Sequence, residues 1–128
     1  MAARIKDNRN DLSKAVLHDI TFLKSKIGLA VGHEFLVKTE DAGLSGYRQY
    51  YPVPKETLHS VTFVNEQIVI AVGSDNTIIR STDQGNQWNQ IDFSIESGDS
   101  NDDLYDVDFY NSQLGVAVGF NIILVTEN

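Results

Sequence analysis

A six-residue phrase that occurs three times constrains the fold of this 128-residue chain more than any other sequence feature. Its copies begin 41 and 46 residues apart, at residues 17–22 (LHDITF), 58–63 (LHSVTF) and 104–109 (LYDVDF). Two further phrases follow every copy in the same order. The first contains Ala-Val-Gly, within residues 28–32, 69–73 and 115–119, and the second occupies residues 35–39, 78–81 and 122–126. An internal repeat of this length indicates one structural unit per copy.

Alternation within the phrases predicts β-strands. Ile20 and Phe22 flank Thr21, and the second copy repeats this period of two, which places alternate side chains on opposite faces of a sheet. Four short strands in every ~40 to 50 residues is the spacing of a β-propeller blade. We expect one all-β domain over residues 1–128, with a closing strand and linker at 1–16, repeats at 17–57 and 58–103, and an incomplete repeat at 104–128.

The Ala-Val-Gly phrase predicts close packing. Alanine and glycine let twisted sheets approach each other where large side chains would hold them apart. We therefore interpret the phrase as a packing device between neighbouring sheets.

A second motif follows the third phrase of the middle repeat. The chain reads Ser81-Thr-Asp83-Gln-Gly85-Asn-Gln-Trp88, which matches S/T-x-D-x-G-x-x-W at every defined position. This resembles the Asp-box of bacterial neuraminidase repeats, and the whole repeat resembles propellers of the photosystem II stability and assembly factor type. The third repeat ends inside the motif, and the first carries a partial version with Gly46 in the aromatic position, built on Thr39, Asp41 and Gly43.

The expected role of the Asp-box is structural. The Asp83 carboxylate can accept hydrogen bonds from its own turn, Gly85 supplies a positive φ, and Trp88 buries an aromatic face. The resemblance implies that this turn lies at the blade periphery, away from a ligand-binding centre. It also implies roles in protein assembly or ligand docking.

Charge and composition exclude several partners. Ten Lys and Arg against 18 Asp and Glu give a net charge of −8, the wrong sign for binding nucleic acid or an anionic membrane. No stretch approaches the ~20 apolar residues of a membrane span. The absence of cysteine excludes thiolate chemistry and leaves the compartment undetermined. The acidic residues 96–103 lack the glycine and glutamate of a calcium loop, so we expect no metal and no cofactor.

A candidate ligand-binding set comes from equivalent repeat positions. The first strand of a propeller blade is innermost, so side chains at the second and third positions of the six-residue phrase can line the mouth of a central channel: His18, Asp19, His59, Ser60, Tyr105 and Asp106. Imidazole, phenol and carboxylate groups can bind a sugar or a peptide. The alternative is that they are half-exposed polar residues that complete turns.

Three blades are fewer than the ~4 to 8 that close a propeller. We expect a second copy to complete a ring of six blades about a two-fold axis, with the N-terminal strand at residues 3–5 completing the other copy's last blade. The alternative is that the chain is a piece of a longer propeller.

The predicted function is a non-catalytic binding or assembly scaffold that oligomerises, with a protein or glycan ligand. One alternative is a glycan-binding lectin; another is a degenerate sialidase-like hydrolase. A sialidase needs a cluster of arginines, and this chain has only four arginines in all, so we expect no enzyme activity. The tyrosine-rich segment 47–54 is predicted to be either an outer edge strand or a protein-binding patch.

Overall fold

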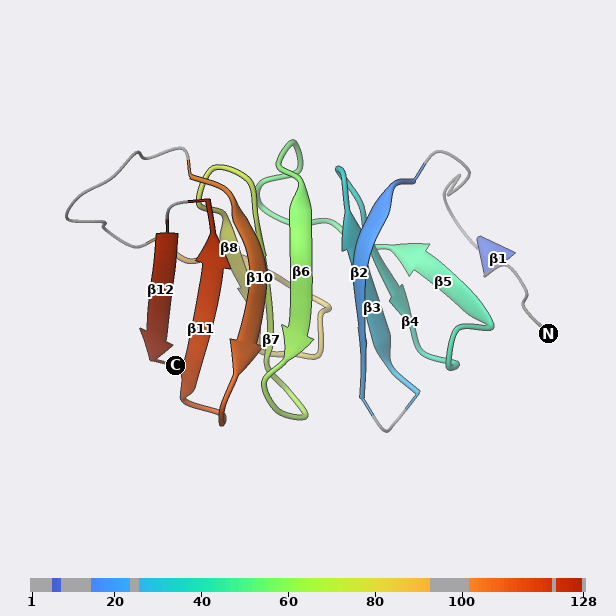
Figure 1. The fold of residues 1–128 in the computed structure, drawn as a ribbon. Helices are drawn as coiled ribbons and strands as arrows, with labels where there is room; N and C mark the ends of the chain where they lie inside the picture. Colours follow the sequence, from blue (N-terminus) through green and yellow to red (C-terminus); the bar gives the residue numbers. More distant parts are fainter. Residues whose placement is uncertain (1–5, 8–14, 24–25, 93–101, 121, 128) are drawn as a thin grey trace.

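The computed structural model describes residues 6–7, 15–23, 26–92, 102–120 and 122–127. These residues form three β-sheets that stand side by side and are antiparallel apart from one short parallel pair in the first (Figure 1). We name them blades 1, 2 and 3 in chain order. The described residues contain no helix, and so none that could span a membrane.

Each blade is built from consecutive strands. Blade 1 contains β2 (Leu17–Phe22), β3 (Gly28–Gly32), β4 (Leu36–Thr39) and β5 (Ser45–Arg48), with the short strand β1 (Lys6–Asp7) added beyond β5. Blade 2 contains β6 (Leu58–Phe63), β7 (Val69–Gly73), β8 (Ile78–Ser81) and β9 (Asn89–Gln90). Among the described residues, blade 3 contains three strands, β10 (Leu104–Phe109), β11 (Leu114–Gly119) and β12 (Ile122–Glu127). The predicted all-β architecture is confirmed.

The first and last described strands, β1 and β12, lie at opposite ends of the row of blades (Figure 1). Strand β1 pairs in parallel with β5, in the register Lys6 to Ser45 and Asp7 to Gly46. Residues 3–5, expected to complete a third blade, lie outside the described residues, and the strand directly after them belongs to the edge of blade 1.

Side-chain caps explain why the chain reverses where it does. The Asn65 side chain accepts hydrogen bonds from the backbone N–H groups of Gln67 and Ile68, both at 2.8 Å, in the hairpin between β6 and β7. Asn111 does the same at the equivalent hairpin of blade 3. Such Asx turns fix a reversal with the asparagine's own side chain.

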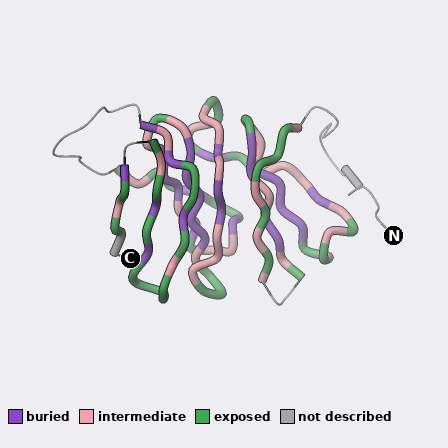
Figure 2. Tube along the Cα trace, viewed as in Figure 1, coloured by how far each residue is buried: buried purple, intermediate pink, exposed green. Residues whose placement is uncertain are grey.

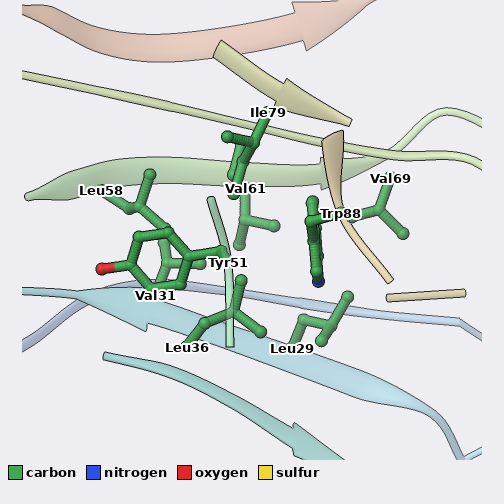
Figure 3. Packing of buried hydrophobic residues seen from close by; sticks show 10 residues of the cluster. Leu29, Val31, Leu36, Tyr51, Leu58, Val61, Val69, Ile79 and Trp88 are labelled. Carbon is green, nitrogen blue, oxygen red and sulfur yellow. The ribbon is translucent and has the colours of Figure 1, made fainter. Parts of the chain in front are cut away.

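The core lies between the blades rather than within a single layer. One cluster joins blades 1 and 2 through the residues labelled in Figure 3: Leu29, Val31, Leu36, Tyr51, Leu58, Val61, Val69, Ile79 and Trp88. A second cluster joins blades 2 and 3 and includes Ile70, Val72, Ile78, Leu104 and Val107. Figure 2 shows the buried segments concentrated in the middle of the molecule. Blade 2 is therefore covered on both faces.

The Ala-Val-Gly phrase has two separate roles. Ala71 and Ala117 are fully buried in the clusters between blades, as expected for a packing device. The glycine acts inside its own blade, which differs from the prediction. A Cβ at Gly73 would lie 1.9 Å from the carbonyl oxygen of Thr57, and a Cβ at Gly119 would lie 1.8 Å from that of Asp103. The glycine is needed because the backbone that enters the inner strand crosses directly over it.

Candidate binding site on the inner strands

The inner strands β2, β6 and β10 lie next to one another and share an irregularity. The register of β2 against β3 shifts between Leu17 and Asp19, and equivalent shifts occur in β6 and β10. The extra residue in each blade is the second one of the repeated phrase: His18, His59 or Tyr105. A β-bulge takes one residue out of the ladder and re-aims its side chain.

The bulges bring three aromatic side chains from three blades into one row. The ring centroids of His18 and His59 are 5.5 Å apart, and those of His59 and Tyr105 are 5.1 Å apart, with tilted planes. Such tilted contacts at this separation are favourable for aromatic rings. We name these three residues the mouth row. The structure thus brings together residues that the repeat placed at equivalent positions.

The mouth row is partly open to solvent. His18 and Tyr105 are exposed, whereas His59 between them is half-buried. Burial lowers the pKa of His59, and neighbouring His18 lowers it further, while Asp103 has the opposite effect. This shift favours the neutral imidazole of His59, which can both donate and accept a hydrogen bond.

A hydrogen-bonded chain of polar side chains runs beside the mouth row. The Ser60 hydroxyl lies 3.1 Å from Oδ2 of Asp19 and 2.9 Å from Oδ1 of Asp106. Asp19 also accepts a hydrogen bond from the backbone N–H of Val61, at 3.0 Å. Ser60 is buried, so this network joins the three inner strands across the blade boundaries. These contacts give Asp19 and Ser60 a structural role, while Asp106 keeps an exposed carboxylate.

The predicted Asp-box of blade 2 forms a closed turn between β8 and β9. Ser81 donates to Oδ1 of Asp83 at 2.7 Å and accepts from the Gly85 N–H at 2.8 Å. Oδ1 of Asp83 also accepts from the backbone N–H of Gln87, at 2.9 Å. Gly85 has φ of 89°, and the Trp88 indole N–H donates to its carbonyl. Partial burial would raise the pKa of Asp83, but the hydrogen bonds outweigh it and the pKa is lowered.

The partial motif of blade 1 forms the same kind of turn between β4 and β5. Thr39 donates to Oδ1 of Asp41 at 2.8 Å, and Gly43, at φ of 93°, donates to Thr39. Ser45 donates two more hydrogen bonds to the Asp41 carboxylate, from its hydroxyl to Oδ2 at 2.6 Å and from its backbone N–H to Oδ1 at 2.8 Å. The Ser45 and Thr39 hydrogen bonds lower the pKa of Asp41 to about 2. Both turns join outer strands, whereas the mouth row lies on the inner strands.

Sequence reasoning missed a buried lysine between blades 1 and 2. Lys38 on β4 is almost fully buried. Its Nζ donates a hydrogen bond to Oδ1 of Asn86 at 2.6 Å, and this bond links the last part of β4 in blade 1 to the predicted Asp-box turn of blade 2. Burial lowers the pKa of Lys38, while Glu40 and Asp83 act in the opposite direction. A lysine on a short strand gives no sequence signal of burial, because its partner lies 48 residues away.

A groove at the outer side of blades 1 and 2 was only partly foreseen. It has a volume of about 450 Å³ and is lined by two segments, residues 49–52 and 86–89. Tyr50 in the first segment is exposed, whereas Tyr51 is buried with its hydroxyl donating to the Glu56 carbonyl. Only the first two residues of the tyrosine-rich segment belong to β5, which is not an edge strand because β1 pairs with its outer side. Residues 49–52 form one wall of the groove. Among the described residues, no cluster of His, Asp and Glu is arranged to hold a metal ion.

Successive antiparallel sheets packed face to face, with their first strands side by side, define the blades of a β-propeller. Comparison with solved structures gives the same fold. The chain is similar to YCF48 bound to D1 peptide, with 21% identity, a TM-score of 0.75 and coverage of 89% of this chain and 37% of that one. It is also similar to YCF48 from Cyanidioschyzon merolae, with 18% identity, a TM-score of 0.73 and coverage of 94% and 40%.

The chain thus spans well under half the length of these two structures. No protein-family model matches the sequence, and no curated protein matches it.

Proposed function

We propose that this chain is a non-catalytic scaffold that binds an extended segment of a partner protein at the mouth row. The observation that carries the proposal is the continuous row of His18, His59 and Tyr105, held by one bulge in each blade. A similar solved propeller, YCF48, holds a peptide, which supports a peptide as the ligand class here.

The chemistry of the mouth row suits a peptide. Two imidazoles and a phenol offer aromatic faces together with hydrogen-bond donors and acceptors, and the exposed carboxylate of Asp106 adds a charged acceptor. The Ser60 hydroxyl is buried between two carboxylates, which suits a structural connection and not a nucleophile. Residues of this set therefore position a ligand without reacting with it.

We propose further that a second copy closes the ring. Blade 3 exposes an apolar face made of Val116, Val118, Ile123 and Val125, and blade 1 exposes Ile20 and Phe22. Inside the chain, faces of this kind are covered by the next blade. Two copies arranged about a two-fold axis would cover all four end faces and give six blades. The predicted Asp-box turns would then stabilise the outer hairpins of this assembly.

Binding measurements with a defined peptide test the mouth row. The probe is the D1 peptide of the YCF48 complex, titrated calorimetrically into the full chain. We expect Tyr105→Ala and His59→Ala to weaken binding about tenfold, as expected for loss of a buried contact or hydrogen bond. Tyr110→Ala is the matched control, because Tyr110 is exposed and lies outside the mouth row. Equal binding by all variants, or binding to a glycan array with none to the peptide, would contradict the proposal.

Light scattering at two concentrations tests ring closure. We expect a mass near twice 14.3 kDa that persists on dilution. A folded monomer at both concentrations would rule out closure by a second copy, and polydisperse aggregates would favour a piece of a longer propeller.

A further inference from the structure

The outer edge of blade 1 already holds an added strand. Strand β1 lies parallel to β5 and pairs with Ser45 and Gly46, directly after the Asp41 turn. A sheet edge presents unpaired N–H and C=O groups, so it is a template for an extended segment. Blade 1 therefore demonstrates what this kind of edge accepts.

Blade 2 has an equivalent edge. Arg48 of β5 pairs with Val37, and Gln90 of β9 pairs with Ile79, so the two outer strands are in matching register. Counting back from these pairs, Gln87 and Trp88 occupy the positions that Ser45 and Gly46 hold in blade 1, although they lie directly before β9 whereas Ser45 and Gly46 belong to β5. Among the described residues, no strand pairs with the outer side of β9.

The backbone of β9 leaves a donor on its outer side. The N–H of Ile91 donates inward to the carbonyl of Ile78 at 2.8 Å. Backbone groups of successive strand residues point to opposite sides, so the N–H of Gln90 points outward. An incoming strand can therefore bond to β9 without disturbing its pairing with β8.

The groove lies at this same edge. Gln87, Trp88 and Asn89 line one wall, and the exposed Tyr50 belongs to the other. The buried Trp88 is fixed by its hydrogen bond to Gly85, so its side of the groove is already formed. Side-chain pockets beside a free strand edge are the features that give specificity to β-strand addition.

We propose that the outer edge of blade 2 binds an extended, positively charged peptide segment as a parallel added strand, with the groove receiving its side chains. The parallel direction follows from β1 on the equivalent edge of blade 1. The residues that line the groove are uncharged, so the preference for a positively charged segment rests on the net charge of −8 of the whole chain, which attracts cationic segments and repels acidic ones. This site is separate from the mouth row and involves none of its residues.

The probe is a capped peptide with the sequence of residues 2–8 (AARIKDN), which contains the segment that pairs with β5 and has one arginine, one lysine and one aspartate. It is titrated into the isotope-labelled full chain, and backbone amide shifts are followed by NMR. We expect shifts at residues 86–90 and none at His18 or His59. A probe with both basic residues replaced by glutamate is expected to bind more weakly.

Two matched variants test the backbone contact. Gln90→Pro removes the outward N–H on an edge strand, where proline is tolerated, and is expected to weaken binding about tenfold. Gln90→Ala keeps the N–H and is expected to bind like the unmodified chain. If Gln90→Pro does not fold, a probe with N-methylated backbone amides tests the same ladder, because it lacks the N–H groups that the probe would donate to β9. We expect this probe to bind more weakly than the unmodified one.

Three results would overturn the proposal. The first is that the Gln90→Pro variant binds the probe, or the unmodified chain binds the N-methylated probe, as tightly as the unmodified chain binds the unmodified probe. The second is that the chemical shift changes are confined to the mouth row. The third is that a neutral oligosaccharide such as cellotriose, but not the peptide, shifts the amide signals of residues 86–90. Loss of D1 peptide binding at the mouth row would leave this measurement unaffected, so the two proposals fail independently.

Discussion

Blades 2 and 3 carry similar side chains at equivalent positions with very different burial. Ile70 and Val72 on β7 are 5% and 0% exposed, whereas the equivalent Val116 and Val118 on β11 are 41% and 40% exposed. On the next strand, Ile78 is 5% exposed and its equivalent Ile123 is 74% exposed. The difference comes from the neighbour, since blade 3 packs against these residues of blade 2 and no described residues cover blade 3.

Blade 1 shows the same difference on the opposite face. Val61 of blade 2 is buried against blade 1, whereas the equivalent Ile20 is exposed. A blade in this protein is thus a unit whose stability depends on nearest neighbours, as in other repeat proteins.

The dependence of each blade on its neighbour is tested most strongly by placing an aspartate at equivalent positions of blades 2 and 3. Val72→Asp buries a carboxylate between blades 2 and 3 and is expected to lower the free energy of unfolding by about 4 kcal/mol. Val118→Asp places the same charge on the exposed face, so we expect a folded chain in which the proposed closure by a second copy is lost. Denaturant unfolding and light scattering measure the two effects. Equal destabilisation by both variants would show that the face of blade 3 is covered within one chain.

The glycines that end β7 and β11 are expected to behave alike, because their close contact lies within one blade. A Cβ at Gly73 or Gly119 would meet a carbonyl oxygen of the same blade at under 2 Å. Each Gly→Ala change is expected to cost about 2 kcal/mol, in the range for overpacking of a tightly packed site. Denaturant unfolding of the two variants measures this cost. A much smaller cost in blade 3 would mean that its backbone can shift because one face is free.

The smallest expected effect concerns acid stability at the blade 1 turn. The pKa of Asp41 is lowered to about 2 in the folded protein, below its ordinary value of 3.8. A depressed carboxyl pKa contributes stability that is present above the unfolded value and lost as pH falls toward the folded value. We therefore expect the contribution of Asp41 to disappear between about pH 4 and pH 2. Asp41→Asn should flatten this part of the stability curve, measured by thermal unfolding, and an unchanged slope would contradict this assignment.

The repeated phrases predict most of the strands, because alternation and turn residues are local signals. The first phrase coincides with β2, β6 and β10 at every boundary, and the third begins within a residue of its strand in every blade. The positive φ expected at Gly85 is confirmed. These features depend on residues close together in the chain.

The remaining features depend on contacts between distant residues. The bulge at His59 exists only relative to β7, and the burial of Lys38 depends on Asn86 in another blade. The position of β1 on blade 1 depends on a parallel pairing that no turn enforces. His18, His59 and Tyr105 stand at equivalent positions in the repeat, but their contact depends on the packing of the three inner strands side by side.

The bulges on the inner strands separate the choice of side chain from the strand pairing that stabilises the sheet. On these inner strands a ladder residue pairs with the second strand of its own blade, but the bulged position makes no such pair, and it holds an imidazole in two blades and a phenol in the third. The same frame can therefore present different chemical groups side by side without repacking. In the proposed binding site each blade contributes one such position, so a substitution at the bulge of one blade is expected to change one ligand contact and to leave the ladder pairs of the inner strands in place.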